Sequence, residues 1–263
     1  MWREAWIISK TLKQIKAGRL VCAVVYTTPS AGDSSKVRAE KQHASNEARE
    51  KLNARTSLEK LERVLAANFD SGDLYVTLTY DDKHLPPDRS AAVRRIRSFI
   101  PKLREARKAR GEGLAYVYVT EGAYPGGRLH HHMVLNATGD DIEELRAVWK
   151  YGANVEVRRL RFDEEYTYGD LASYLTKEPR EWGHPKVGER TWTPAIGLRR
   201  PQQETFNVPD NLTLMAPPDA VSVEVQRSES NGFGSYSWIK YLLPPEESKR
   251  KRSKKRKRKN KKE

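Results

Sequence analysis

The chain has 263 residues and a formal net charge of +14, with 37% hydrophobic and 32% charged residues. No stretch approaches the ~18 consecutive apolar residues of a membrane helix, and the first residues lack the apolar core of a secretory signal. The single cysteine, Cys22, excludes an intrachain disulfide and a metal site made of cysteines alone. We therefore expect a soluble intracellular protein without a membrane partner.

The positive charge is concentrated at the C-terminus. Residues 249–263 hold twelve of the 49 basic residues and one Glu, so this tail carries +11 and the rest of the chain is nearly balanced. Such a run cannot bury a core, and it suits a polyanion because each neutralised phosphate releases counterions. A merely solubilising tail is the alternative. We expect DNA binding by the first basic residues of the tail, Lys249, Arg250, Lys251, Arg252, Lys254, Lys255 and Arg256.

Apolar periodicity predicts the elements in chain order. We expect a strand over 20–28, one or two helices over 36–68, a strand over 74–81, a helix over 89–110, strands over 114–121 and 129–136, a helix over 140–150, a strand over 155–162, a helix over 169–177, and a late strand pair over 221–226 and 236–243. Pro101 is expected to break or bend its helix. Residues 180–218 are expected to be mostly loop.

The glycine-rich turn between the strands 114–121 and 129–136 predicts an antiparallel hairpin. The predicted fold class is therefore α+β, with a central antiparallel β-sheet and its flanking helices on one face. The sequence contains neither a phosphate-binding P-loop nor a dinucleotide-binding glycine motif.

The most informative segment is GRLHHHMVLN at residues 127–136. Side chains alternate along a strand, so His130 and His132 are expected on one face and His131 on the other. Two imidazoles on one strand face can hold a metal ion. A chance surface cluster or a hydrogen-bonded core histidine would give the same pattern.

Glu121 is a candidate third ligand because the hairpin brings the end of its strand beside the histidines. Two histidines and one carboxylate leave coordination positions open, as in catalytic metal sites. Such a set suits Mg²⁺ or Mn²⁺, and Zn²⁺ would also fit.

The segment GDLASYLTKEP, residues 169–179, offers a candidate nucleophile. On a helix, Asp170, Tyr174 and Lys177 share a face. A phenol has a pKa near ~10, and an adjacent ammonium group or metal favours the reactive phenolate. In the alternative interpretation, Tyr174 packs the helix onto the sheet and Lys177 is solvated.

Together these segments resemble a known family. LYVTLTYDD at 74–82, E-x6-R-L-H-H-H at 121–132 and YLTKE at 174–178 are similar to the three ordered motifs of the HUH endonucleases. More narrowly, they resemble the rolling-circle replication initiators of phages, plasmids and small single-stranded DNA viruses. The resemblance covers about residues 52–201.

The resemblance implies roles for individual residues. His130, His132 and Glu121 would bind a divalent metal, Mg²⁺ or Mn²⁺, and Tyr174 would attack single-stranded origin DNA to form a 5′-phosphotyrosine, assisted by Lys177. The fold would be the palm-like α+β sheet of HUH endonucleases. Because no helicase domain follows, a host or separate helicase and polymerase would be needed.

The sequence thus predicts an N-terminal strand and helical segment at 1–70, a nuclease domain at 70–245 and the tail at 246–263. The expected location is the cytoplasm of a bacterial host, or the nucleus if the host is eukaryotic. One alternative function is a single-strand transposase or a relaxase. Another is a non-catalytic nucleic-acid-binding protein, in which Tyr116 and Tyr118 stack on bases and the three metal-ligand candidates need not meet.

Overall fold

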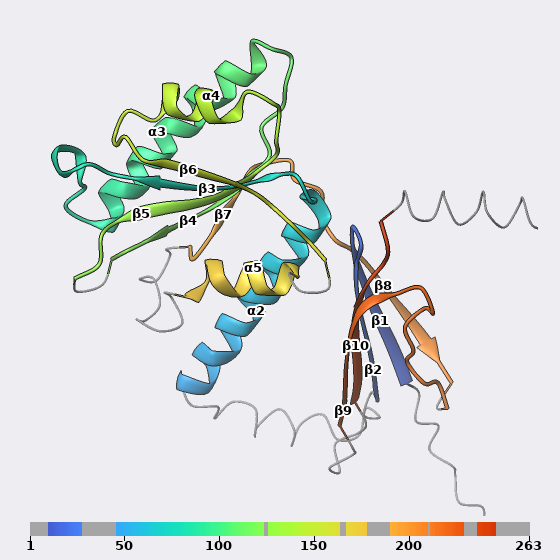
Figure 1. The fold of residues 1–263 in the computed structure, drawn as a ribbon. Helices are drawn as coiled ribbons and strands as arrows, with labels where there is room; N and C mark the ends of the chain where they lie inside the picture. The colour runs from blue at the N-terminus through green and yellow to red at the C-terminus, as the bar shows by residue number, and fades with distance from the viewer. Residues whose placement is uncertain are drawn as a thin grey trace, which may run out of the picture. The chain divides into compact units, whose positions relative to one another are not determined.

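The computed structural model describes residues 10–27, 46–123, 126–163, 167–177, 190–209, 211–228 and 236–245 (Figure 1). The chain divides into two compact units, which are residues 51–199 and residues 1–50 with 200–263. This division differs from the boundaries expected at residues 70 and 245, because backbone pairing joins strands near the N-terminus to strands beyond residue 200. The expected helical residues 36–45 and the tail at 246–263 lie outside the described residues.

Unit 51–199 contains an antiparallel five-stranded sheet, which confirms the predicted α+β class. Its strand order is β6-β3-β5-β4-β7. The long strands coincide with the expected ones, since each alternates or is fully apolar. The strands are β3 (Leu74–Thr79), β4 (Tyr116–Glu121), β5 (His130–Leu135), β6 (Val155–Arg159) and β7 (Thr193–Pro194).

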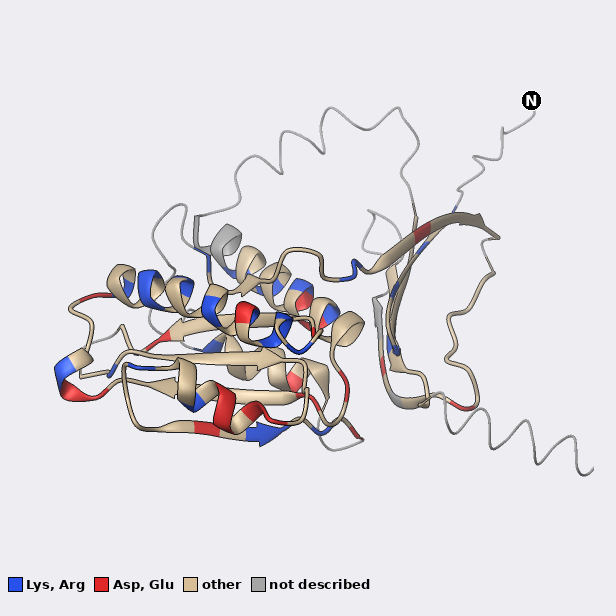
Figure 2. Ribbon diagram, turned by 90° about the horizontal axis from the view of Figure 1, so that it is seen from above, with Lys and Arg blue, Asp and Glu red and all other residues tan. Residues whose placement is uncertain are grey.

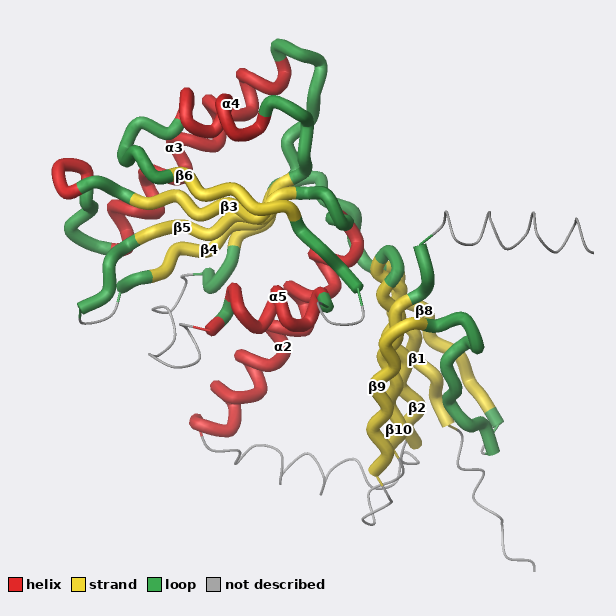
Figure 3. The backbone as a smooth tube through the Cα atoms, in the orientation of Figure 1, coloured by secondary structure: helices red, strands yellow, loops and turns green. Residues whose placement is uncertain are grey.

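The helices lie on both faces of this sheet, so the expectation of a single covered face is wrong (Figures 1 and 3). One face carries α3 (Arg89–Lys108) and α4 (Asp141–Val148). The other carries α5 (Tyr168–Leu175), with α2 (Asn46–Asn68) on the same side. The second face needs a cover because it too is apolar, with three fully buried valines, Val117, Val119 and Val134.

The main core lies between α3, α4 and the sheet. Phe99 and Leu103 of α3 are buried there against Val76 and Met133 of the strands. Helix α3 continues through Pro101, so the expected break is absent. Burial of the apolar residues on either side stabilises the helix by ~1.5–3 kcal/mol each, which offsets the ~3 kcal/mol cost of an internal proline.

The second unit contains its own antiparallel five-stranded sheet, of order β8-β1-β2-β10-β9. The late strand pair is confirmed, but it belongs to this sheet rather than to the sheet of the first unit. Strand β8 lies where loop was expected, because its sequence, QQETFNV, has no apolar alternation and it is held by pairing with β1. The strands are β1 (Lys10–Ala17), β2 (Leu20–Thr27), β8 (Gln202–Val208), β9 (Val221–Ser228) and β10 (Tyr236–Leu242).

Charges of both signs are interspersed along the described parts of the two units (Figure 2). This agrees with the near balance of basic and acidic residues outside the tail. Among the described residues, no helix has the length and apolar character needed to cross a membrane.

Candidate active site

The hairpin of β4 and β5 builds the metal-ligand cluster. In its register Glu121 lies opposite His130, and Val119 lies opposite His132. Directly opposed residues share a face of an antiparallel sheet, so the carboxylate and both imidazoles project together toward the α5 side. The expected ligands therefore meet.

The three side chains converge closely enough to share one ion. The Nε2 atoms of His130 and His132 are 3.1 Å apart, and Glu121 Oε2 lies 3.8 Å and 3.5 Å from them. Ligand atoms held ~2.1 Å from one ion, at tetrahedral or octahedral angles, lie about 3.0–3.4 Å apart. The separations in this cluster are close to that range.

The second nitrogen of each imidazole is already occupied. His130 Nδ1 lies 2.8 Å from the backbone oxygen of Arg128, to which it donates. His132 Nδ1 lies 2.5 Å from the Tyr75 hydroxyl and 3.3 Å from that of Thr77. With Nδ1 protonated, each ring presents the Nε2 lone pair to the cluster, which is the tautomer that binds a metal through Nε2.

Glu121 supplies a further indication of a cation. Its Oε1 atom is buried and has no hydrogen-bond partner in the described part of the chain. A buried carboxylate oxygen without a partner is costly, and a bound cation would satisfy it. The donor set of two imidazoles and one carboxylate, together with this orphaned oxygen, fits a divalent metal ion.

Gly122 allows the turn to approach the histidine strand. Its φ is +86°, in the region that favours glycine, and a Cβ atom there would lie 2.1 Å from the backbone oxygen of Arg128. That oxygen is the partner of His130 Nδ1. A side chain at this position would therefore displace the group that orients His130.

His131 lies on the opposite face, as the strand alternation predicted. It is fully buried between the Tyr80 hydroxyl, 2.6 Å from its Nε2, and the Thr120 hydroxyl, 2.9 Å from its Nδ1. Burial lowers the pKa of His131 to about 3, with a smaller contribution from the neighbouring histidines. His131 is therefore a neutral core residue rather than a ligand.

Helix α5 brings Tyr174 to the cluster. A capping box starts the helix, in which Thr167 accepts from Asp170 N and Asp170 accepts from Thr167 N. Tyr168 anchors it by stacking on Phe162 and by donating to the Phe69 carbonyl oxygen. Asp170 is thus used in the cap rather than at the site.

Tyr174 itself is 55% exposed, so it does not serve mainly to pack the helix. Its ring centroid lies 5.7 Å from that of His132 and 6.2 Å from that of Tyr75. The hydroxyl-bearing ring therefore stands beside the metal-ligand cluster and is accessible to a substrate.

Lys177 follows α5 and is exposed, and within the described residues no hydrogen bond ties it to Tyr174. The cluster brings in two residues that the sequence motifs did not single out, Tyr75 and Thr77. Their positions follow from the pairing of β3 with β5, in which Thr77 lies opposite His132. That pairing joins strands far apart in the sequence, so only the alternation of β3 hinted at it.

Residues of the first motif lie outside the cluster. Asp81 caps the short 3-10 helix Asp82–His84 and accepts from His84, whose hydrogen bond holds the pKa of Asp81 below its usual value. Arg128 pairs with Asp82 and the Tyr80 carbonyl oxygen. These contacts fix the loop against the start of β5.

Fold and site together define an α+β domain whose antiparallel sheet carries a histidine–carboxylate cluster beside an accessible tyrosine. Residues 73–179 match the family model of the replication-associated proteins of the ORF2 type. The match includes all three motifs and confirms the predicted resemblance to replication initiators. No curated protein and no solved structure matches the chain significantly.

Proposed function

We propose that this protein initiates replication by nicking and rejoining single-stranded origin DNA through Tyr174. The observation that carries this proposal is the position of the exposed Tyr174 ring beside His132, on the sheet face where Glu121 and His130 converge. A nucleophile and a group that can hold a divalent ion are the two parts that phosphodiester transesterification needs.

The chemistry conserves the number of ester bonds. The Tyr174 oxygen attacks a backbone phosphorus, the bond from phosphorus to the 3′ oxygen breaks, and the phosphoryl group stays on the tyrosine. The phenol loses its proton and the 3′ oxygen gains one, so the products are a 5′-phosphotyrosine and a free 3′-hydroxyl. Attack by that hydroxyl reverses the step and rejoins the strand without external energy.

A divalent ion, Mg²⁺ or Mn²⁺, would polarise the phosphoryl oxygen when bound to His130, His132 and Glu121. Tyr75 and Arg128 hold the two imidazoles in the tautomer that this ligation requires. Lys177 contributes positive charge near the developing phenolate, in the last described turn after α5. The C-terminal basic tail would hold DNA through its phosphates.

The proposal is tested by mixing the protein with labelled single-stranded DNA from the source element, with Mn²⁺ or with chelator. We expect a covalent protein–DNA adduct that requires the metal and is lost in Tyr174→Phe, while Tyr174→Phe still binds DNA. Tyr26→Phe is a matched control from the other unit and should form the adduct. An adduct that persists in Tyr174→Phe would remove Tyr174 from the nucleophile role.

A single-strand transposase or relaxase would use the same chemistry, and the match to replication-associated proteins favours initiation. The non-catalytic alternative relied on Tyr116 and Tyr118 as base-stacking platforms, yet both are buried on the α3 face. It also expected the metal-ligand candidates to lie apart, whereas they converge. DNA binding without any adduct over the whole element would restore it. A separate helicase and polymerase remain the partners that this function requires.

A further inference from the structure

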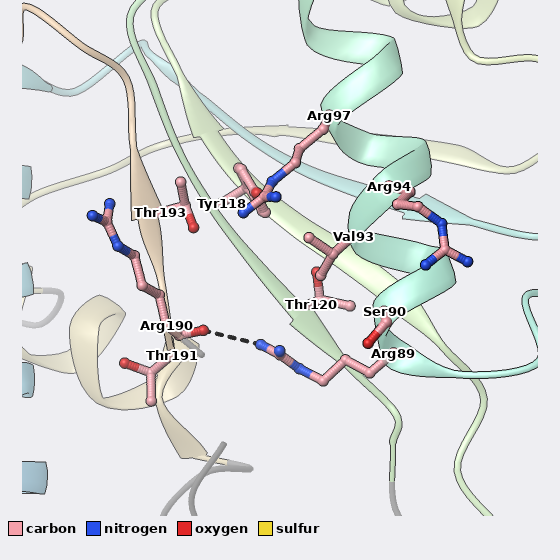
Figure 4. Close-up of a pocket in the computed structure, with 10 residues that line it drawn as sticks. All are labelled: Arg89, Ser90, Val93, Arg94, Arg97, Tyr118, Thr120, Arg190, Thr191 and Thr193. Carbon is pink, nitrogen blue, oxygen red and sulfur yellow. Dashed lines mark hydrogen bonds between the residues drawn. The ribbon is translucent and has the colours of Figure 1, made fainter. Parts of the chain in front are cut away.

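A cavity of about 340 Å³ lies on the sheet face opposite to the metal-ligand cluster (Figure 4). One wall is the N-terminal half of α3 and the other is the segment that leads into β7. The floor is formed by β4, through the buried Tyr118 and Thr120. The lining residues are Arg89, Ser90, Val93, Arg94, Arg97, Tyr118, Thr120, Arg190, Thr191 and Thr193.

The lining of this cavity has one sign of charge. Four arginines contribute to it, and none of its lining residues is acidic. The α3 positions fall at helical spacing, so Arg89, Arg94 and Arg97 are carried by one side of the helix. Arg89 Nη2 donates to the Arg190 carbonyl oxygen at 3.0 Å, which links the two walls (Figure 4).

Arginine and hydroxyl groups together are the donors that recognise phosphate oxygens. Guanidinium groups bind phosphate through paired N–H donors, and the hydroxyls of Ser90, Thr191 and Thr193 add neutral ones. Arg94 and Arg97 are exposed, so an anionic ligand can reach them from solvent. The positive charge of the lining is therefore available to such a ligand.

The cavity is adjacent in sequence to the candidate active site. Thr120 lines the cavity and its neighbour Glu121 belongs to the metal-ligand cluster, and the two side chains project to opposite faces of β4. Beyond Tyr118, β4 has no ladder partner in β7. The free end of β4 is therefore where a strand leaving the cluster can pass to the other face.

We propose that this arginine-lined cavity binds the phosphates of single-stranded DNA next to the cleaved phosphodiester. This inference rests on the proposed function, because the cavity would hold the same strand that Tyr174 cleaves. It assigns to α3 a binding role separate from the chemistry and separate from the basic tail.

The test removes two cavity charges with Arg94→Gln/Arg97→Gln and compares Lys102→Gln/Lys108→Gln. The control pair removes the same charge from exposed positions of the same helix outside the cavity. Full-length proteins are titrated into a labelled oligothymidylate at several salt concentrations. The logarithm of the binding constant falls with the logarithm of salt by ~0.7 per neutralised phosphate in single strands.

We expect the slope to become shallower by about 1.4 in the cavity variant, because two phosphates are no longer neutralised, and to stay at the wild-type value in the control. Equal slopes in the two variants would overturn the inference. Inorganic phosphate that competes as strongly as the oligonucleotide, at matched ionic strength, would also overturn it, since the cavity would then bind isolated phosphate.

Adduct formation is measured separately at saturating DNA. The cavity variant should form the Tyr174 adduct at the wild-type rate, because Arg94 and Arg97 lie away from the cluster. A wild-type protein that forms no adduct, yet shows the slope difference, would refute the nuclease function and keep the cavity as a strand-binding site. A normal adduct with unchanged slopes would do the reverse.

Discussion

The Tyr75 hydroxyl lies 2.5 Å from Nδ1 of His132, the nitrogen that faces away from the metal-ligand cluster. The two rings also stack, with their centroids 5.3 Å apart. Burial raises the pKa of Tyr75, with a further contribution from Tyr174, so the group stays a neutral phenol. It can accept the Nδ1 proton of His132 and so hold that ring in the metal-binding tautomer.

Replacement of Tyr75 by Phe should therefore weaken metal binding. Loss of a hydrogen-bond partner behind a ligating histidine typically costs ~10–100-fold in metal affinity. Calorimetric titration with Mn²⁺ measures it, and Tyr241→Phe, in the other unit, provides a control with the same loss of a buried hydroxyl. Wild-type affinity in Tyr75→Phe would show that Thr77 or the backbone suffices to orient His132.

Stability should fall in acid partly because of His131. Its pKa in the folded protein is about 3, below the ~6.5 of an unfolded histidine, so protons bind the unfolded chain preferentially. The contribution of His131 is complete above pH ~6.5 and is lost as the pH falls toward 3, by up to ~1.4 kcal/mol per pH unit. Urea unfolding of the wild type and His131→Gln across this window, with chelator, should give a shallower pH dependence for the variant. Parallel curves would contradict this assignment.

Arg107 is fully buried and ties α3 to α4. It pairs with Asp141 at 2.9 Å and with Glu144 at 3.1 Å, and it donates to Asn136. Arg107→Met should destabilise the protein by about 3–5 kcal/mol, because two carboxylates lose their buried partner. The measurement is the free energy of unfolding in urea.

The control for this change is Arg158→Ala. Arg158 also pairs with a carboxylate, Glu156, but its side chain is 72% exposed. Exposed pairs contribute ~0–1 kcal/mol. Similar losses in the two variants would mean that the buried network contributes no more than a surface pair.

Deletion of residues 249–263 should weaken DNA binding and flatten its salt dependence while leaving adduct formation at saturating DNA intact. Twelve basic residues are removed, and the salt slope on a single strand falls by ~0.7 for each phosphate that the tail no longer neutralises. The measurement is the same salt titration of the oligothymidylate. A slope equal to that of the full chain would exclude phosphate binding by the tail.

The sequence by itself determined much of this protein because several signals are local. Strand alternation separates His130 and His132 from His131, and the short hairpin fixes Glu121 opposite His130. Helical spacing likewise places Tyr174 on a defined face of α5. These relationships need only neighbours in the chain, so residue pattern and turn chemistry suffice to predict them.

Only the tertiary structure decided what depends on distant pairing. The partnership of Tyr75 with His132 follows from the ladder between β3 and β5. The polar strand β8 exists because β1 pairs with it, and α3 continues through Pro101 because the sheet holds both of its halves. The arginine-lined cavity needs α3, β4 and the segment before β7 together. In each case backbone pairing or burial against remote residues outweighs local preference, and that energy cannot be read from a local pattern.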